Sequence, residues 1–158
     1  MSVVTKTGDK GETGVMGKRL PKDDVLIEII GELDELMAVM GIVGDKVKGI
    51  GKICDTTNRH LYYISGYLAG YHKDLELKES IKKIEKDIAK LEMELSEIHE
   101  FLKAGGQLNV WLNWARTVCR RTERRMVSLN KVEKIDKNIL IFINRLSDYL
   151  FILSRKLK

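Results

Sequence analysis

Four glycines, each three residues after the last, dominate the stretch TKTGDKGETGVMGKR, which covers residues 5–19. Glycine and turn-forming residues let several backbone N–H groups converge on one point, as they do in loops that hold phosphate groups. The known phosphate motifs do not fit, because a P-loop would need other residues where Glu12 and Arg19 stand, and GxGxxG is absent. Two interpretations therefore stay open: an anion-binding arm, or a disordered and solvated terminus.

Five arginines crowd the stretch NWARTVCRRTERR, residues 113–125. On a helix, Arg116, Arg120 and Arg124 would align one turn apart, with Glu123 close by. Guanidinium groups so placed repel one another unless an anion lies against them, and their donor geometry suits phosphate oxygens. A solvated basic face with surface ion pairs is the alternative. Apolar residues on or near the same face disfavour it; they stand at positions 108, 112, 115, 119, 122 and 126.

Acidic residues interrupt an apolar helical pattern in the stretch GELDELM, residues 31–37. We expect Glu32 and Glu35 to face water. Asp34 could instead be drawn towards an interface, where a buried carboxylate requires a cation, and the arginine-rich stretch could supply one.

The stretch NRLSDYLF, residues 144–151, places Asn144 and Arg145 about one turn before Asp148. By itself it is an ordinary amphipathic segment. The chain's histidines are scattered and indicate neither a metal site nor a base for a nucleophile. They are His60, His72 and His99.

Composition favours a globular protein with an anionic partner. The chain has 158 residues, a net charge of +5 and a sequence pI near 9.1, and a basic balance attracts nucleotides, nucleic acids or acidic membranes without choosing among them. Cys54 and Cys119 have no CxxC spacing, so we expect reduced thiols in a cytoplasmic protein. No apolar run approaches the length of a membrane span, and we expect no membrane partner.

Helical periodicity runs through most of the chain after residue 20, and we see no convincing alternating strand. One proline, and only Gly105 and Gly106 after Gly70, predict long helices, with Gly44 among the residues that end the first. The third has apolar residues at alternating spacings of 3 and 4 from Ile81 to Ile98. We predict helices over about 22–43, 52–70, 81–98, 107–129 and 135–157. The fold class is then all-α, a five-helix antiparallel bundle in one domain, 1–158, with a flexible Gly-rich arm at 1–20 and the bundle at 22–158.

Five stretches, taken in order, carry a family resemblance. They are TKTGDKGETG, RLPKDD, GELDEL, AGGQLNVWLNWARTVCRRTERR and NRLSDYLF. Together they closely resemble the PduO-type ATP:cob(I)alamin adenosyltransferases, over residues 5–155. The resemblance implies a five-helix bundle that assembles as a homotrimer, with active sites between adjacent subunits. It also implies a reaction in which the Co(I) of cob(I)alamin attacks C5′ of ATP, giving adenosylcobalamin and triphosphate.

The resemblance further implies a set of ATP-binding residues: Thr5, Lys6, Thr7, Gly8, Thr13, Gly14, Lys22, Arg120, Arg121, Glu123, Arg124 and Asn144. In this reading the arginines, with Mg²⁺, stabilise the charge that grows on the leaving triphosphate. Asp34 would pair with Arg120 of the partner subunit and shape the corrinoid cleft. Phe101 would press on the corrin face and keep a lower ligand off the cobalt.

Partners also follow from this resemblance: ATP and a corrinoid, a flavin-type reductase and a cobalamin-dependent mutase, with no nucleic acid. Three residues depart from the common pattern, namely Glu12, Ala104 and Asn113. Trp111 and Trp114 are expected in the core or at a subunit contact. Two alternatives remain: a basic helical module that binds nucleic acid, and a corrinoid carrier or ATP sensor that keeps the fold without catalysis.

Overall fold

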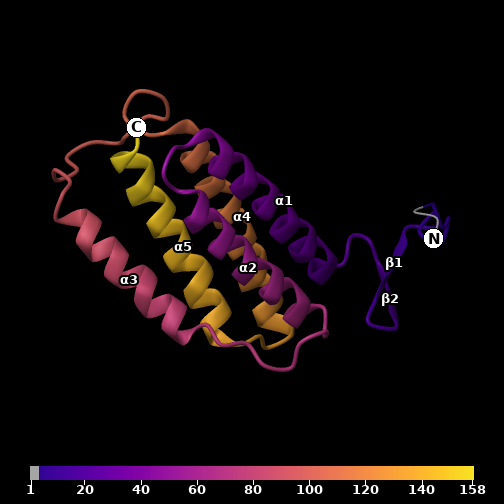
Figure 1. Ribbon diagram of the computed structural model, residues 1–158. Helices are drawn as coiled ribbons and strands as arrows, with labels where there is room; N and C mark the ends of the chain where they lie inside the picture. Colours follow the sequence, from indigo (N-terminus) through magenta and orange to yellow (C-terminus); the bar gives the residue numbers. More distant parts are fainter. Residues whose placement is uncertain (1–3) are drawn as a thin grey trace.

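The computed structural model describes residues 4–158 as a bundle of helices preceded by a short β-hairpin (Figure 1). The helices are α1 (Val25–Lys46), α2 (Gly51–Leu68), α3 (Lys78–Glu92), α4 (Val110–Val132) and α5 (Lys137–Lys156). Helix α1 packs against α2 and α4, α4 packs against α5, and α3 lies along the outer side of α5. The predicted five-helix bundle is confirmed. Each helix of the described chain is too short or too polar to cross a membrane.

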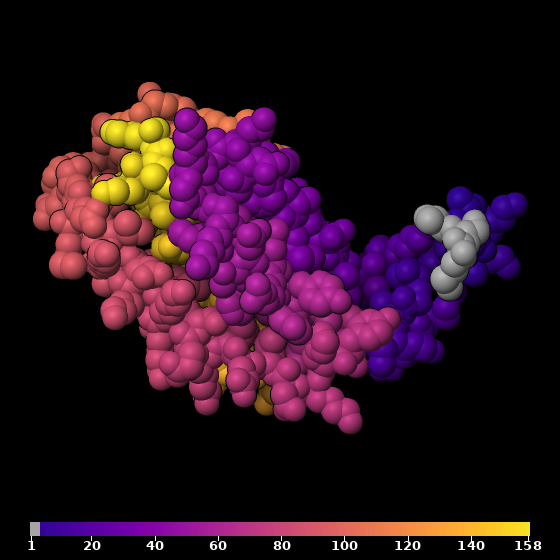
Figure 2. Space-filling model, in the orientation of Figure 1, coloured from indigo at the N-terminus to yellow at the C-terminus, as the bar shows by residue number. Residues whose placement is uncertain are grey.

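The hairpin corrects the expectation that the chain forms no strand. Strands β1 (Glu12–Val15) and β2 (Lys18–Pro21) pair antiparallel, with Glu12 opposite Pro21. Met16 and Gly17 connect them, both with positive φ (43° and 74°), as a two-residue hairpin turn requires. Four residues per strand are too few for alternation to be recognised in the sequence. The hairpin projects from the end of the bundle where α1 begins (Figures 1 and 2).

Helix α1 begins where predicted but does not end at Gly44. The Asp24 carboxylate caps it by accepting a hydrogen bond from the Leu26 N–H at 2.8 Å. The helix continues through Gly44 to Lys46. A Cβ added at Gly44 would lie 3.3 Å from Cβ of Cys54, so this glycine permits the close approach of α1 and α2. The turn itself is made at Gly49, which has φ of +85°.

Helix α3 is shorter than its apolar pattern predicts, because it ends at Glu92 rather than near Ile98. The last turn of α5 holds the chain that follows it. Arg155 donates a hydrogen bond to the Ser96 carbonyl, and Lys156 pairs with Glu94. These contacts turn the chain away from the helix axis, and Ile98 is left 46% exposed.

The hydrophobic core lies among α1, α2, α4 and α5, with Ile81 as the one α3 residue buried within it in the described chain. Its largest side chains include Leu33, Leu112 and Phe142, all nearly inaccessible to solvent. Burial of this kind supplies most of the free energy of folding. The core therefore gives α4 and α5 a rigid frame on which polar side chains can be positioned.

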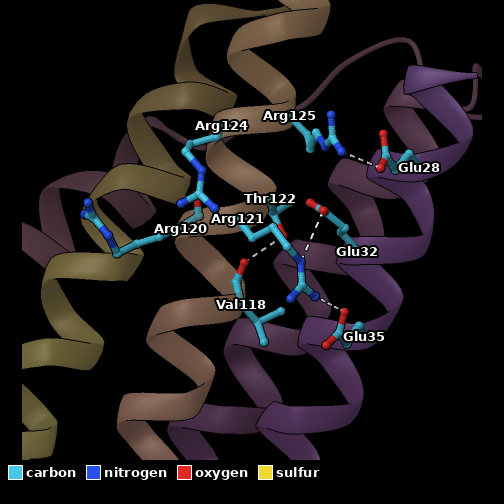
Figure 3. A network of polar contacts seen from close by, with 9 residues as sticks. All are labelled: Glu28, Glu32, Glu35, Val118, Arg120, Arg121, Thr122, Arg124 and Arg125. Atoms are coloured by element: carbon cyan, nitrogen blue, oxygen red, sulfur yellow. Dashed lines mark hydrogen bonds and ion pairs between the residues drawn. The ribbon is translucent and has the colours of Figure 1, made fainter.

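A network of ion pairs fixes α4 against α1 (Figure 3). Arg121 Nε lies 3.2 Å from Glu32 Oε1, and its Nη2 pairs with Glu35. Arg125 Nη2 lies 2.8 Å from Glu28 Oε1. Glu35 remains partly exposed, but Glu32 is only 8% exposed. The expectation that Glu32 faces water is therefore wrong, because α4 packs over this carboxylate and the partly exposed Arg121 side chain supplies its cation.

Glu32 is not fully satisfied by that partner. Its Oε2 is buried and has no hydrogen-bond partner among residues 4–158. Burial raises the pKa of Glu32 above its ordinary value, and the nearby Arg121 guanidinium only partly opposes that rise. The ion pair between Arg121 and Glu32 holds α4 and α1 together, although burial disfavours the charged form of the Glu32 carboxylate.

Replacing Arg121 with alanine should lower the free energy of unfolding by about 1–3 kcal/mol, because a buried acceptor loses its charged donor. The loss should be larger near pH 8 than near pH 5. A carboxyl group with a raised pKa in the folded state contributes stability that is present below its unfolded pKa and lost as the pH rises through the folded pKa. Without Arg121 that pKa rises further. Urea denaturation followed by circular dichroism at both pH values measures the effect.

The matched control is Arg121→Ala combined with Glu32→Gln, which removes the buried charge as well. The double variant should be less sensitive to pH than Arg121→Ala alone. An equal loss for Arg121→Ala at both pH values would contradict this account of Glu32.

Candidate functional site

The exposed arginines of α4 form the first part of the site. Successive helical residues are separated by about 100° around the axis, so Arg120 and Arg124 point away from the α1 side that Arg121 and Arg125 occupy (Figure 3). In the part of the chain that the structure describes, neither Arg120 nor Arg124 has a carboxylate oxygen within 4.0 Å. Arg124 Nη1 instead donates to the Arg120 carbonyl at 3.2 Å. Two positive charges on one face are therefore available to an anion.

The facing side of α5 supplies an amide beside these arginines. Asn144 Nδ2 donates to Glu123 Oε1 at 2.9 Å, and Asn144 Oδ1 accepts from Arg145 Nη1 at 2.7 Å. The contact between Asn144 and Glu123 joins α5 to α4. The structure thus brings together four of the predicted site residues, Arg120, Glu123, Arg124 and Asn144, on two neighbouring helices.

The first part of the arm, residues 5–8, is held by β2 and by the residue after it. Arg19 Nη2 donates to the Thr7 carbonyl at 2.7 Å, and the Thr5 and Thr7 hydroxyls lie 2.9 Å apart. The ammonium group of Lys22 lies over Gly8, since a Cβ added there would be 3.2 Å from Nζ. The Lys22 side chain therefore lies close to the backbone at Gly8.

The hairpin carries the remaining arm residues. Thr13 and Gly14 lie on β1, opposite Leu20 and Arg19. Glu12, a departure from the family pattern, pairs with Arg19 at 3.4 Å. The negative charge of Glu12 is thus directed at Arg19.

These parts do not meet in one pocket within a single chain. Among residues 5–158, no hydrogen bond or ion pair links the arm to α4 or α5. Asp34 is exposed on α1. Phe101 is 91% exposed in the segment between α3 and α4. Figure 2 shows the arm projecting from one end of the bundle, where its turn residue Met16 lies near Gly70 after α2.

The chain offers no thiolate nucleophile at this site. Cys54 and Cys119 are free and buried. Burial raises the pKa of Cys54 to about 11 and that of Cys119 further still, and the Cys119 thiol donates to the Ile143 carbonyl at 3.3 Å. Both stay protonated near neutral pH. Among the described residues, no group of three or more His, Cys, Asp or Glu side chains could hold a metal ion.

One face of the first turns of α4 is apolar but exposed to solvent, while Leu112 on the other face belongs to the core. Trp111 and Trp114 are 36% and 42% exposed, with ring centroids 6.4 Å apart, so a core position is wrong for both. Asn113, another departure, accepts a hydrogen bond from Arg116 Nε at 2.9 Å. Arg116 in turn lies 5.8 Å from the centroid of the Phe151 ring, a cation–π contact rather than an anion site.

Sequence reasoning missed three contributors: Glu32, which anchors Arg121; Arg19, which holds the arm; and Glu85, which contacts Arg145 Nε at 2.8 Å. Each works through a residue distant in the chain. The pairing of Glu12 with Arg19 across the hairpin was a signal that a strand prediction would have uncovered. Glu85 carried no such signal, because it is one of many charged residues in the sequence of α3 and nothing in their spacing shows which of them meets α5.

Comparison with known proteins places the chain in a family. A sequence model described as cobalamin adenosyltransferase matches residues 3–157. The chain is 38% identical over 165 residues to the corrinoid adenosyltransferase of Bacillus subtilis, covering 98% of this chain and 86% of that protein. It is 35% identical over 168 residues to the human corrinoid adenosyltransferase, covering 97% of this chain and 67% of that protein.

Solved structures agree with this. A variant PduO-type ATP:corrinoid adenosyltransferase from Lactobacillus reuteri, complexed with cobalamin and ATP, superimposes with a TM-score of 0.89 at 31% identity, covering 98% of this chain and 92% of that one. A second variant of that protein, complexed with ATP, gives the same TM-score. The match spans the arm as well as the bundle, and the chain therefore belongs to the cobalamin adenosyltransferase family.

Proposed function

We propose that this protein transfers the 5′-deoxyadenosyl group of ATP to the cobalt of cob(I)alamin, giving adenosylcobalamin and triphosphate. Relatives named corrinoid adenosyltransferases, aligned over nearly the whole chain, support this function. The single observation that carries it is the exposed pair Arg120 and Arg124, which have no carboxylate partner among residues 4–158, while Arg121 and Arg125 pair with carboxylates of α1. A triphosphate is the kind of polyanion that such a pair binds.

The reaction places few demands on protein acids or bases. The cobalt of the substrate donates two electrons to C5′ of ATP, the new Co–C bond forms, and the C5′–O bond breaks. The triphosphate leaves with the electron pair of the broken C5′–O bond, so the growing negative charge lies on the triphosphate oxygens. Arg120 and Arg124 stabilise this charge, and alignment of the two substrates contributes much of what remains. Buried, protonated thiols and scattered histidines are compatible with such chemistry.

The arm holds the other side of the nucleotide in this proposal. Its contacts come from Thr5, Lys6, Thr7, Gly8, Thr13, Gly14 and Lys22. The Lys22 ammonium beside Gly8 supports a phosphate contact there. From the bundle, Glu123 and Asn144 join the two arginines. Arg121 is engaged by Glu32 and Glu35, so we assign it the role of holding α4 in place rather than a principal contact with ATP.

Mg²⁺ would arrive with the triphosphate. This cation usually keeps several water ligands and binds substrate phosphates with only one or two carboxylates. Glu123 is the carboxylate among the proposed ATP-binding residues, so the side chains present fit such an ion. Bound in this way, Mg²⁺ would neutralise charge on the leaving triphosphate.

The separation of arm, Asp34, Phe101 and arginines within one chain supports a site completed by another copy. We place the site between subunits of a homotrimer, with Asp34 paired to Arg120 of the partner subunit. The exposed Phe101 presses on the corrin face. Trp111 and Trp114 contribute apolar surface to a subunit contact.

The remaining expectations follow as parts of the same proposal. Residues 1–158 act as one domain, with the arm at 1–20 and the bundle at 22–158. Free, buried cysteines support a reducing compartment, the cytoplasm. A flavin-type reductase supplies the electrons for Co(I), and a cobalamin-dependent mutase uses the product. Binding of nucleic acid is disfavoured, because aromatic residues for base stacking are only 6% of the chain.

Incubation with ATP, Mg²⁺ and chemically reduced cobalamin should produce the visible spectrum of adenosylcobalamin, with release of triphosphate. The reason is that the cationic pair on α4 accommodates the leaving group. A reaction without ATP is the control. Absence of product, together with binding to duplex DNA that weakens steeply with salt, would favour the nucleic-acid module instead.

Arg120→Ala and Arg124→Ala should each reduce kcat/KM for ATP by about 100-fold, the effect of one lost charge-assisted contact to a phosphate in the transition state. Both variants should keep the assembly state of the parent protein, measured by light scattering. Arg125→Ala is the matched control, because Arg125 pairs with Glu28 on the other side of α4. Parental rates from both Arg120→Ala and Arg124→Ala would refute their assignment.

Asp34→Asn removes the negative charge proposed to pair across the subunit interface, so KM for cobalamin should rise several-fold, by the loss of one exposed or partly buried ion pair. Steady-state kinetics with varied cobalamin measure this. Glu35→Gln, one residue along and committed to Arg121 within the chain, is the comparison. An unchanged KM in Asp34→Asn would remove the proposed role.

A further inference from the structure

We infer that Glu85 on α3 is a positioning residue for the nucleotide site. It orients Arg145, which in turn fixes the side-chain amide of Asn144. The inference rests on the proposed function, in which Asn144 contacts ATP. It assigns to α3, the helix on the outer side of α5 (Figure 1), an effect on a site formed by α4 and α5.

Three contacts connect the helices in sequence. Glu85 Oε1 accepts from Arg145 Nε at 2.8 Å, Arg145 Nη1 donates to Asn144 Oδ1 at 2.7 Å, and Asn144 Nδ2 donates to Glu123 Oε1 at 2.9 Å. Every donor in this chain of contacts faces an acceptor, and three of the four groups are charged. Such charge-assisted hydrogen bonds are stronger than those between neutral groups.

The two partners of Asn144 allow its amide only one orientation. A guanidinium group can only donate, and an ionised carboxylate can only accept. Turning the amide by 180° would place its NH₂ group against Arg145 and its oxygen against Glu123, which replaces two attractions by two repulsions. The NH₂ group then keeps a defined direction, with its second hydrogen available to an acceptor on a ligand.

Arg145 needs Glu85 to hold that geometry. Its other carboxylate neighbour, Asp148, lies one turn along the same helix at 3.9 Å from Nη1, well beyond hydrogen-bond length. The Arg145 side chain is 37% exposed and Glu85 is 46% exposed. A long, partly exposed side chain with a single contact would sample several rotamers. The second contact, made through Nε by a different helix, sets the plane of the guanidinium group.

This arrangement predicts an effect on binding with little effect on stability. Partly exposed ion pairs contribute little to the free energy of unfolding. If the pair had only a structural role, breaking it would therefore change neither the free energy of unfolding nor ATP binding appreciably. Breaking a pair that positions Asn144 would change the free energy of unfolding equally little. It would nevertheless weaken ATP binding, because the amide of Asn144 would lose its single orientation.

Glu85→Ala tests this in the full-length protein, with ATP binding measured by isothermal titration calorimetry. The Kd for ATP should rise about 3- to 10-fold, the effect of one hydrogen bond. Glu79→Ala is the matched control, because Glu79 lies on the same helix and its ion pair in the described chain is with Lys82, at 2.8 Å. Its Kd should equal that of the parent. Glu85→Gln keeps an acceptor oxygen and should show a smaller rise than Glu85→Ala.

The route through Asn144 is tested by a double-mutant cycle. In an Asn144→Ala background, Glu85→Ala should have no further effect on the Kd for ATP. A rise in Kd that persists in that background, or a parental Kd in Glu85→Ala alone, would overturn the inference.

A measurement without ATP separates this inference from the proposed function. The chain has six asparagines, so ¹⁵N-asparagine labelling gives few side-chain NH₂ signals, and Asn144→Ala identifies the one of interest. The chemical shift of that signal should change in Glu85→Ala and remain the same in Glu79→Ala. If the parent fails to bind ATP, the proposed function fails while this signal still tests the contact. An unmoved signal in Glu85→Ala overturns the inference whatever ATP does.

Discussion

The contact between Arg121 and the buried Glu32 constrains the rest of the site. A carboxylate taken out of water requires a cation, and the only cations that face this part of α1 in the described chain come from α4. Once Arg121 and Arg125 turn towards α1, helical geometry places Arg120 and Arg124 on a neighbouring face, about 100° around the axis of α4. This run of arginines thereby serves two purposes, since Arg121 and Arg125 hold two helices together, while Arg120 and Arg124 have no carboxylate partner in the described chain and stay available to a ligand.

The separation between the arm and the bundle is the second organising feature. Within the arm, Arg19 and Lys22 fasten the leading residues to the hairpin, so this element has its own internal order. Within the bundle, α4 and α5 carry preorganised charges on a rigid core. A substrate lying between two such elements would be aligned by both, which suits a reaction whose nucleophile is itself a substrate and which needs positioning more than proton transfer.

Helix α3 shows how an outer element can influence a site that it does not line. Its apolar stripe contributes a single fully buried residue, Ile81, to the core, and its end is set by contacts from α5. The same face also presents Glu85 to Arg145. Since long charged side chains sample many rotamers when free, a carboxylate from a neighbouring helix is an economical way to define the plane of a guanidinium group beside a functional amide.

The positions of the helices could be predicted from apolar periodicity alone, and the activity from family motifs. Both are possible because apolar spacing and short polar stretches are local properties of the chain. Tertiary structure decided what local patterns could not. The apolar repeat of α3 ran on to Ile98, but the helix ends at Glu92, and Arg155 and Lys156 of α5 contact the segment that follows it. Glu32 looked like a solvated residue, but packing of α4 on α1 buried it beside Arg121. Which arginines stay free depends on carboxylates supplied by α1, and the direction of the Asn144 amide depends on Glu123 of α4 as well as on its own neighbour Arg145. The spacing of residues within one helix does not encode the partners on other helices.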